Sequence, residues 1–196
     1  MPDLFDLVTD LAKAFAQADA LSPVAVSQRK TPTYKPGIGP NAENDAIRLA
    51  LDQLKLIPPY RTAKLGQFLP YPDARQKCDL WIGEPLEWAI EVKMARFVGD
   101  NGRVDDMAVK DLLSPFAKDR SAVTDRKKLA EADFGCNKAM VIYGFEIPER
   151  PLNLAIAAFE TLARAQVELG PRHEQTFGPL VHQYHSMGRL FGWAIS

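Results

Sequence analysis

The chain has 196 residues, a formal net charge of -1, 46% hydrophobic residues and 25% charged residues. This composition is typical of one core-forming domain and excludes a fibrous or low-complexity protein. Near-neutral charge excludes a strongly basic coat protein, so any contact with nucleic acid must depend on a local basic patch or on metal ions. The two cysteines, Cys78 and Cys136, are far apart in the sequence, which excludes a disulfide framework and a structural zinc site.

No apolar run approaches the roughly 18 residues that span a bilayer, and the start of the chain lacks the basic and apolar regions of a secretory signal. We therefore expect a cytoplasmic protein without a membrane partner. We expect a single domain over 1–196, in which an N-terminal helix and basic connector (1–40) and a C-terminal helix and hairpin (147–196) extend a core at 41–146.

Two helices are predicted in the first third of the chain. Apolar residues at spacings of three and four predict an amphipathic helix over 3–21. A connector rich in proline and glycine follows it, over 27–40. Asn41 is a favourable N-cap for a second helix over 42–56, which also carries Glu43.

The hydrophobic period then changes to that of strands. Short segments rich in Leu, Ile, Val and Trp, with turn residues between them, predict an antiparallel three-strand meander at 64–69, 77–83 and 86–95. We expect next a short helix, a helix capped by Thr124, a strand buried on both faces, a long helix and a terminal hairpin, at 107–117, 124–132, 138–145, 151–169 and 180–195. These elements predict an α/β domain with a central mixed β-sheet flanked by helices.

The turn Gly83-Glu84-Pro85 predicts the register of the second and third strands. In a hairpin symmetric about Pro85, Asp79 lies directly opposite Glu91, with their Cβ atoms about 4.5 to 5.5 Å apart. Lys93 shares their face because strand side chains alternate. The opposite face then forms an apolar core surface made of Leu80, Ile82, Trp88, Ile90 and Val92.

Two carboxylates this close repel each other unless a cation lies between them. The carboxylates of Asp79 and Glu91, with waters and the backbone carbonyl of Val92, make an oxygen-rich site that suits Mg²⁺ or Mn²⁺ and not zinc. The ammonium of Lys93 would orient a water or stabilise negative charge on a phosphate. The pattern therefore predicts hydrolysis of a phosphodiester.

Asp79, eleven residues and then Glu91-Val92-Lys93 resemble the signature of the PD-(D/E)XK, or restriction-endonuclease-like, nuclease superfamily. The predicted order of helix, three-strand meander, helix and strand over 42–145 is similar to the core of that family. The resemblance covers about half of the chain, and it implies a restriction-endonuclease-like fold for that half.

The resemblance also implies roles for individual residues. Asp79 and Glu91 would bind the metal, Lys93 would serve the attacking water, and Glu43 on the first core helix would assist. It implies an Mg²⁺-dependent endonuclease that cuts DNA or RNA, with DNA the first expectation, in restriction, defence or repair. Because a duplex has two strands, a homodimer is also expected.

Several of these residues have a plainer interpretation. Asp73 follows a proline as the literal motif requires, but Asp79 stands at the start of a strand and is the better candidate. Glu91 and Lys93 would be ordinary surface charges on a half-solvated sheet. The helix macrodipole alone would explain Glu43 near a helix N-terminus.

Two groups of basic residues are candidates for contacts with phosphates. The first lies in the connector, where Arg29, Lys30 and Lys35 surround Tyr34, although a solvated linker is the plainer interpretation. The second and stronger group lies near the predicted site and consists of Lys118, Arg120, Arg126, Lys127 and Lys128.

Aromatic and histidine residues add weaker signals. Trp81 shares the face of Asp79, where it would stack on a base or line the sheet beneath a helix. His182 and His185 are three apart in the predicted hairpin, so they would point to opposite faces and would not chelate one ion. His173 is expected in a loop.

Two other classes of function remain open from the sequence. One is a catalytically inactive nuclease-like domain that binds nucleic acid or a protein partner, whose stability would not depend on Mg²⁺ or Mn²⁺. The other is an unrelated metal-free scaffold, in which Asp79 and Glu91 would lie far apart.

Overall fold

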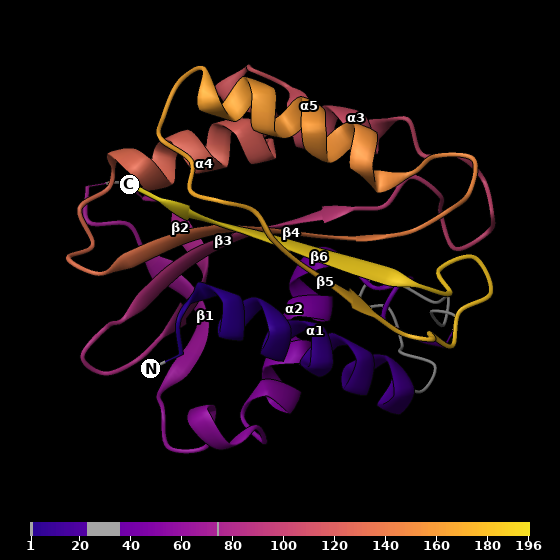
Figure 1. The fold of residues 1–196 in the computed structure, drawn as a ribbon, viewed down its shortest axis with the longest axis horizontal. Helices are drawn as coiled ribbons and strands as arrows, with labels where there is room; N and C mark the ends of the chain where they lie inside the picture. The colour runs from indigo at the N-terminus through magenta and orange to yellow at the C-terminus, as the bar shows by residue number, and fades with distance from the viewer. Residues whose placement is uncertain (1, 23–35, 74) are drawn as a thin grey trace.

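The computed structural model describes residues 2–22, 36–73 and 75–196 (Figure 1). The connector residues Arg29, Lys30, Tyr34 and Lys35 lie outside this range. The α-helices are α1 (Leu4–Leu21), α2 (Glu43–Leu54), α3 (Met107–Leu113), α4 (Ala122–Glu131) and α5 (Leu152–Arg164), with short 3-10 turns at Pro58–Tyr60 and Ala117–Asp119. The strands are β1 (Leu65–Pro70), β2 (Lys77–Ile82), β3 (Trp88–Ala95), β4 (Asn137–Phe145), β5 (His173–Phe177) and β6 (Gly188–Ile195).

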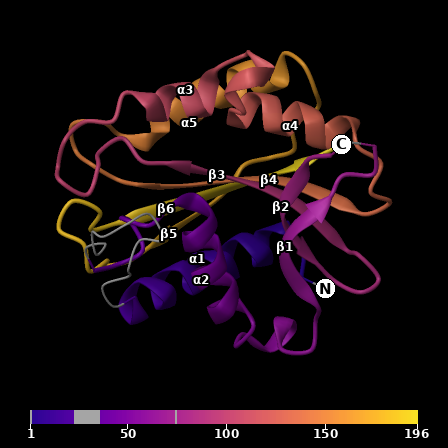
Figure 2. The same cartoon turned by 180° about the vertical axis from the view of Figure 1, so that it is seen from behind.

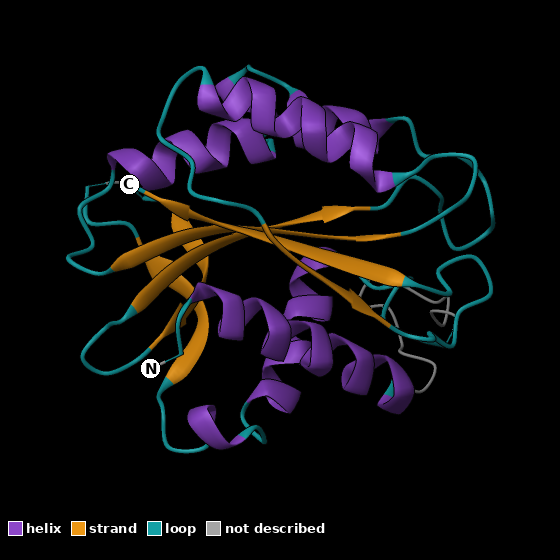
Figure 3. Cartoon of the chain, in the orientation of Figure 1, coloured by secondary structure: helices purple, strands orange, loops and turns teal. Residues whose placement is uncertain are grey.

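One six-stranded mixed sheet lies between two layers of helices (Figures 1 and 2). Its strand order is β1-β2-β3-β4-β6-β5. Strands β3 and β4 run parallel, whereas the other neighbouring strands are antiparallel. Helices α1 and α2 cover one face, and α3, α4 and α5 cover the other (Figure 3). The α/β class and the mixed sheet flanked by helices are thus confirmed.

The register of the β2–β3 hairpin is the predicted one. Leu80 pairs with Ile90 and Ile82 pairs with Trp88, so the hairpin is symmetric about Pro85. The predicted apolar surface also exists, because Leu80, Ile82, Trp88, Ile90 and Val92 all belong to the core between the sheet and helices α1 and α2. The face with Asp79, Glu91 and Lys93 is therefore turned toward α3, α4 and α5.

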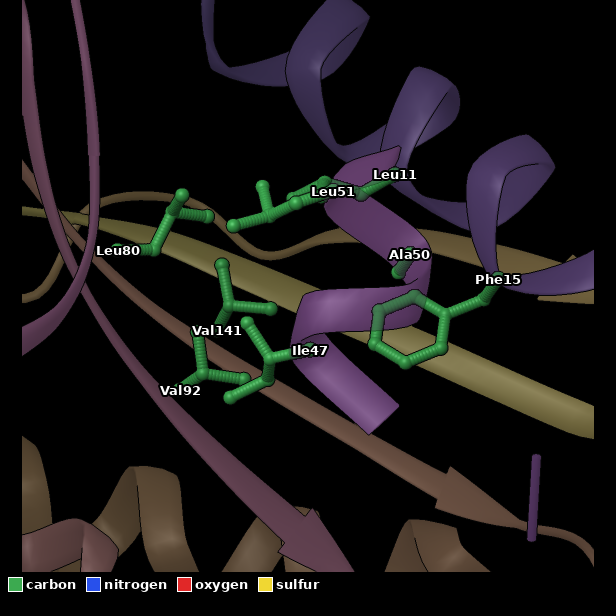
Figure 4. A pocket seen from close by; sticks show the side chains of 8 residues that line it. All are labelled: Leu11, Phe15, Ile47, Ala50, Leu51, Leu80, Val92 and Val141. Atoms are coloured by element: carbon green, nitrogen blue, oxygen red, sulfur yellow. The ribbon is translucent and has the colours of Figure 1, made fainter. Parts of the chain in front are cut away.

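The core beneath the hairpin is densely packed. Figure 4 shows Ile47 and Leu51 of α2 and Phe15 of α1 facing Leu80 and Val92 across a cavity of about 10 Å³. A cavity of that size holds at most one water, and its lining is apolar, so it is a packing defect and no ligand site. The packing ties α2, which carries Glu43 at its first turn, to the strands that carry the other predicted site residues.

Two predicted helix caps are wrong. Helix α2 has Ala42 at its N-cap without a side-chain hydrogen bond, and the buried Asn41 amide instead donates to the carbonyls of Gly37 and Ile38. Helix α4 is capped by Ser121, whose Oγ accepts from the backbone N–H of Thr124 at 3.2 Å. In both places a different local hydrogen bond, between residues three or four apart, replaces the cap that the sequence suggests.

Two predicted helices are too long. Pro115 follows α3 closely and ends the helix at Leu113, short of the predicted 107–117. Helix α5 ends at Arg164. The Arg164 guanidinium donates hydrogen bonds to the carbonyls of Leu169 and Gly170, in the segment that follows the helix. The glycine at 170 therefore follows a turn and not the helix.

The C-terminal hairpin is wider than predicted. Strand β6 pairs with β5, so His173 lies in a strand and not in a loop, and the connection spans 178–187. His182 and His185 lie in that connection, buried, with their rings stacked at 4.6 Å between centroids. The expectation that they point to opposite faces is wrong because the segment is not a strand. His185 Nε2 meets the Val98 carbonyl at 2.7 Å, which indicates a structural role.

The packing of α2 generates a stability prediction. Ile47→Ala removes a fully buried side chain between α2 and the β2–β3 hairpin, so we expect the free energy of unfolding to fall by about 2 to 5 kcal/mol. Arg48→Ala, at the exposed neighbour, is the matched control and should change it by less than about 0.5 kcal/mol. Urea unfolding measures both values. Equal effects of the two substitutions would contradict the packing described here.

Candidate active site

The site forms where the pairing of β2 with β3 stops. The β2–β3 register runs from Ile82–Trp88 to Leu80–Ile90, and beyond it β3 continues to Ala95. Backbone N–H groups of β3 past this point need other acceptors. The Val92 N–H donates to Asp79 Oδ2 at 2.9 Å, and the Met94 N–H donates to Glu43 Oε2 at 2.5 Å. Two carboxylates thus take the place of a neighbouring strand.

This arrangement also places the Val92 carbonyl. The N–H and C=O of one strand residue point to the same edge. Because the Val92 N–H is directed to Asp79, the Val92 carbonyl lies on that same edge of β3. The three oxygen donors predicted for a metal, from Asp79, Glu91 and Val92, therefore come from adjacent positions of β2 and β3.

Glu91 is the most buried of the four predicted catalytic residues, with 2% of its surface exposed. Its Oε1 accepts from the Tyr71 hydroxyl and lies 2.8 Å from Lys128 Nζ. Burial, and after it the adjacent Asp79 carboxyl within hydrogen-bonding reach, raise the pKa of Glu91 to about 9 against the opposing charge of Lys128. The predicted juxtaposition of Asp79 and Glu91 is confirmed, and it carries the electrostatic cost expected of two close carboxyl groups.

Lys93 is surrounded by oxygen acceptors from three other residues. Its Nζ is 2.9 Å from Asp125 Oδ2, 3.8 Å from Glu43 Oε1, and donates to the Arg120 carbonyl at 3.1 Å. Burial lowers the pKa of Lys93, but the carboxylates of Glu43 and Asp125 outweigh it and hold that pKa above its usual range. Lys93 is therefore a charged donor at neutral pH in this arrangement.

Glu43 joins the site from α2. Burial and the nearby charge of Asp79 raise the pKa of Glu43 to about 7, against the opposing charge of Lys93. Its contacts with Lys93 and Met94 go beyond what a helix macrodipole explains. Helix α2 therefore places Glu43 beside the site residues of β2 and β3.

Sequence reasoning missed two residues of the site. Asp125, which the sequence marks only as an acidic residue near a helix N-terminus, is buried and forms ion pairs with Lys93 at 2.9 Å and with Lys128 at 3.3 Å. Its spacing of three from Lys128 on one helix face was a usable signal. Tyr71 lies in the loop after β1, and its hydroxyl donates to Glu91. The Lys128 ammonium lies over the Tyr71 ring, 4.7 Å from the ring centroid. No sequence pattern predicts Tyr71 as a site residue.

These groups lie in an open cleft of about 1040 Å³ between α4 and the sheet. The acidic residues that line it are Glu43, Asp79, Glu91 and Asp125, which are described above, and Glu131 at the end of α4. The basic residues that line it are Arg75, Lys77, Lys93, Arg120, Lys127 and Lys128. A groove with carboxylates at its floor and cations around them suits a polyanion that meets a metal ion.

The predicted phosphate contacts divide into two groups. Arg120, Lys127 and Lys128 line the cleft, and Lys118 is exposed in the adjacent turn. Arg126 is fully buried, and its Nη2 donates to Gln166 Oε1 at 3.4 Å. Arg126 points into the protein because it lies on the core side of α4, so the expectation that it contacts substrate is corrected.

Position in the structure bears on two alternatives that the sequence leaves open, Asp73 against Asp79 and the role of Trp81. Asp73 is exposed in a turn and does not line the cleft, whereas Asp79 does. Trp81, the predicted stacking residue, is half-buried, and its indole lies directly over Gly66, where an added Cβ would come within 3.1 Å of the ring. Trp81 thus packs on β1 and is not among the residues that line the cleft.

The donor set fits a magnesium-type ion in part. Among the described residues, no group of three His, Cys, Asp or Glu side chains is arranged to hold a metal. A zinc or calcium cage is therefore not pre-built in this part of the chain. Mg²⁺ commonly uses one or two carboxylates, waters and substrate phosphates, and Asp79 with Glu91 meets that requirement.

Comparisons with protein-family models, with curated proteins and with solved structures found no match for this chain. In the described residues, no helix is long and apolar enough to cross a membrane.

The two raised carboxyl pKa values generate a pH prediction. Folding raises the pKa from 4.5 to about 7 at Glu43 and to about 9 at Glu91, so both groups bind protons more tightly in the folded state. The free energy of unfolding should therefore fall as pH rises from about 4.5 to about 9. Urea unfolding in EDTA across this range measures it.

Each glutamate should affect the free energy of unfolding over its own pH range. Glu91→Gln should abolish the fall between about pH 7 and 9, and Glu43→Gln should reduce only the fall below about pH 7. A Glu91→Gln profile parallel to that of the wild type would show that Glu91 is not the group held protonated.

Proposed function

We propose that this protein is an Mg²⁺-dependent endonuclease that hydrolyses phosphodiester bonds of DNA or RNA, and DNA is the substrate that we expect first. The observation that carries the proposal is the convergence of Glu43, Asp79, Glu91 and Lys93 at the floor of one cleft. They come from α2, β2 and β3, and they meet where the β2–β3 pairing ends.

The arrangement of elements supports the same family resemblance. Helix α2, the β1–β3 meander, α4 and the parallel strand β4 follow in the order of a restriction-endonuclease-like core. Strand β4 lies beside β3, and α4 presents its polar side to the cleft. We propose this core for residues 42–145, with the flanking segments as additions to it.

A bound divalent ion would supply an activated water and neutralise charge on the phosphate. Asp79 and Glu91 would hold it, with the Val92 carbonyl on the same edge of β3. Lys93 would donate hydrogen bonds to the water or to a phosphate oxygen. Because Asp125 and Glu43 keep its ammonium charged, Lys93 acts as a donor and not as the base that removes a proton.

A catalytically inactive nuclease-like domain is the second candidate. The specific observation in its favour is that Glu91 Oε1 is already engaged by Tyr71 and Lys128. Such a domain would keep the cleft as a binding surface for nucleic acid or a protein and would bind no Mg²⁺. Metal dependence of cleavage and of stability separates the two candidates.

Cleavage tests the proposal directly. Plasmid, linear and single-stranded DNA and RNA are incubated with Mg²⁺, Mn²⁺ or EDTA, and we expect metal-dependent cutting by the wild type. Lys93→Ala and Glu91→Ala should each reduce the rate by about a hundredfold or more, because each removes a group that acts at the reacting phosphate. A linear product from supercoiled plasmid, with few nicked circles, would support the homodimer that the family resemblance implies.

Lys64→Ala is the matched control, since Lys64 is exposed at the start of β1 and pairs only with Glu84 among the described residues. Circular dichroism and melting curves establish that each variant is folded. Full activity of either site variant would overturn the proposed roles, and absence of cutting in every lane would favour the inactive domain.

The cleft also predicts salt-dependent binding. Arg120→Ala and Lys127→Ala should each weaken binding of a labelled duplex and lower the slope of log affinity against log salt by about one. Lys13→Ala, on α1 across the sheet from the cleft, should leave the slope unchanged (Figure 1). Fluorescence anisotropy at several salt concentrations measures both, and equal slopes in all variants would place the substrate elsewhere.

A further inference from the structure

We propose that Lys128 is the resident counter-ion of the metal site, and that it exchanges Glu91 for a substrate phosphate when a divalent ion binds. This inference rests on the proposed function and concerns the order in which metal and substrate engage the site. It gives Lys128 a role distinct from that of the other basic residues of the cleft.

The contacts of Lys128 are those of an internal cation. Its Nζ lies 2.8 Å from Glu91 Oε1 and 3.3 Å from Asp125 Oδ1. The same ammonium lies over the Tyr71 ring, 4.7 Å from its centroid. A buried carboxyl oxygen, the carboxylate of Asp125 and an aromatic face are together the surroundings that stabilise a positive charge.

Its position conflicts with a divalent ion on Glu91. Tyr71 and Lys128 both occupy Oε1 of this carboxylate, and Asp79 is within reach of the same carboxyl group. An ammonium and a divalent ion in contact with one carboxylate repel each other strongly at such distances. Lys128 therefore lowers the affinity of the site for metal for as long as it remains on Glu91.

Lys128 can leave Glu91 without losing its charge partner. Asp125 lies three residues earlier on α4 and remains beside it after such a movement. A quarter of the Lys128 side chain is exposed, and the cleft into which it would move is lined by Lys127 and Arg120. The released ammonium would thus join the cations that face the substrate phosphates.

The exchange predicts that metal and substrate each strengthen the binding of the other, because coupling between two ligands is reciprocal. Metal frees Lys128 for the phosphate, and a phosphate that holds Lys128 leaves Glu91 open to the metal. Without the Lys128 charge, metal should bind more tightly and the coupling should weaken.

Calorimetric titration of the metal-free protein with Mn²⁺ tests this without reference to activity. We expect Lys128→Gln to bind Mn²⁺ about tenfold more tightly than the wild type. Lys127→Gln is the matched control, because it makes the same change of charge at the adjacent cleft residue, and it should alter Mn²⁺ affinity by less than about twofold. Lys128→Arg keeps the charge and should stay near the wild-type value.

The second arm measures coupling in a Lys93→Ala background, where cleavage does not interfere. Mn²⁺ should strengthen binding of a labelled duplex there, and the added Lys128→Gln substitution should remove most of that gain. Melting curves of each variant without metal show whether it is folded, and Lys128→Met, which also removes the charge, provides the reading if Lys128→Gln is not.

The outcomes separate the two proposals. Unchanged or weaker Mn²⁺ binding by Lys128→Gln, with normal binding by the wild type, overturns the role of Lys128 and leaves the proposed nuclease intact. Equal tightening by Lys127→Gln would show a general charge effect and would also overturn it. No Mn²⁺ binding by the wild type would overturn both proposals.

Discussion

The site depends on one interruption of backbone pairing. Strand β3 extends past the end of its register with β2, and the N–H groups of Val92 and Met94 are satisfied by the carboxylates of Asp79 and Glu43. Those two bonds fix acidic side chains from a second strand and a helix against β3. Without them, buried N–H groups would lack acceptors, so the same bonds that build the sheet edge also assemble the charges.

The assembled charges balance within a small volume. Glu91 meets Lys128, Lys93 meets Asp125 and Glu43, and Asp125 joins the two lysines. Such a network is expensive to bury and is better explained by chemistry than by stability, since apolar residues would serve a core at lower cost. The pKa values of Glu43 and Glu91 rise because the effect of burial outweighs that of the nearby lysines.

The two faces of the sheet differ, since one packs an apolar core and the other carries the charged site. Between the sheet and helices α1 and α2 lies an apolar, closely packed core, which includes Ile47 and Val92. On the opposite face, α4 leaves a cleft in which β3 presents Glu91 and Lys93. Alternation along β3 therefore puts rigid packing directly beneath the charged groups, and the proposed catalysis would require such a rigid support.

The sequence alone determined the α/β class, the meander, the hairpin register and the pairing of Asp79 with Glu91, because these follow from short-range periodicity and one turn. Tertiary structure decided the rest. Asp125 and Tyr71 enter the site, and Arg126 leaves it, through the packing of α4 and of the loop after β1. Which side of α4 faces the sheet, and which loop closes over Glu91, are long-range outcomes that local pattern does not encode.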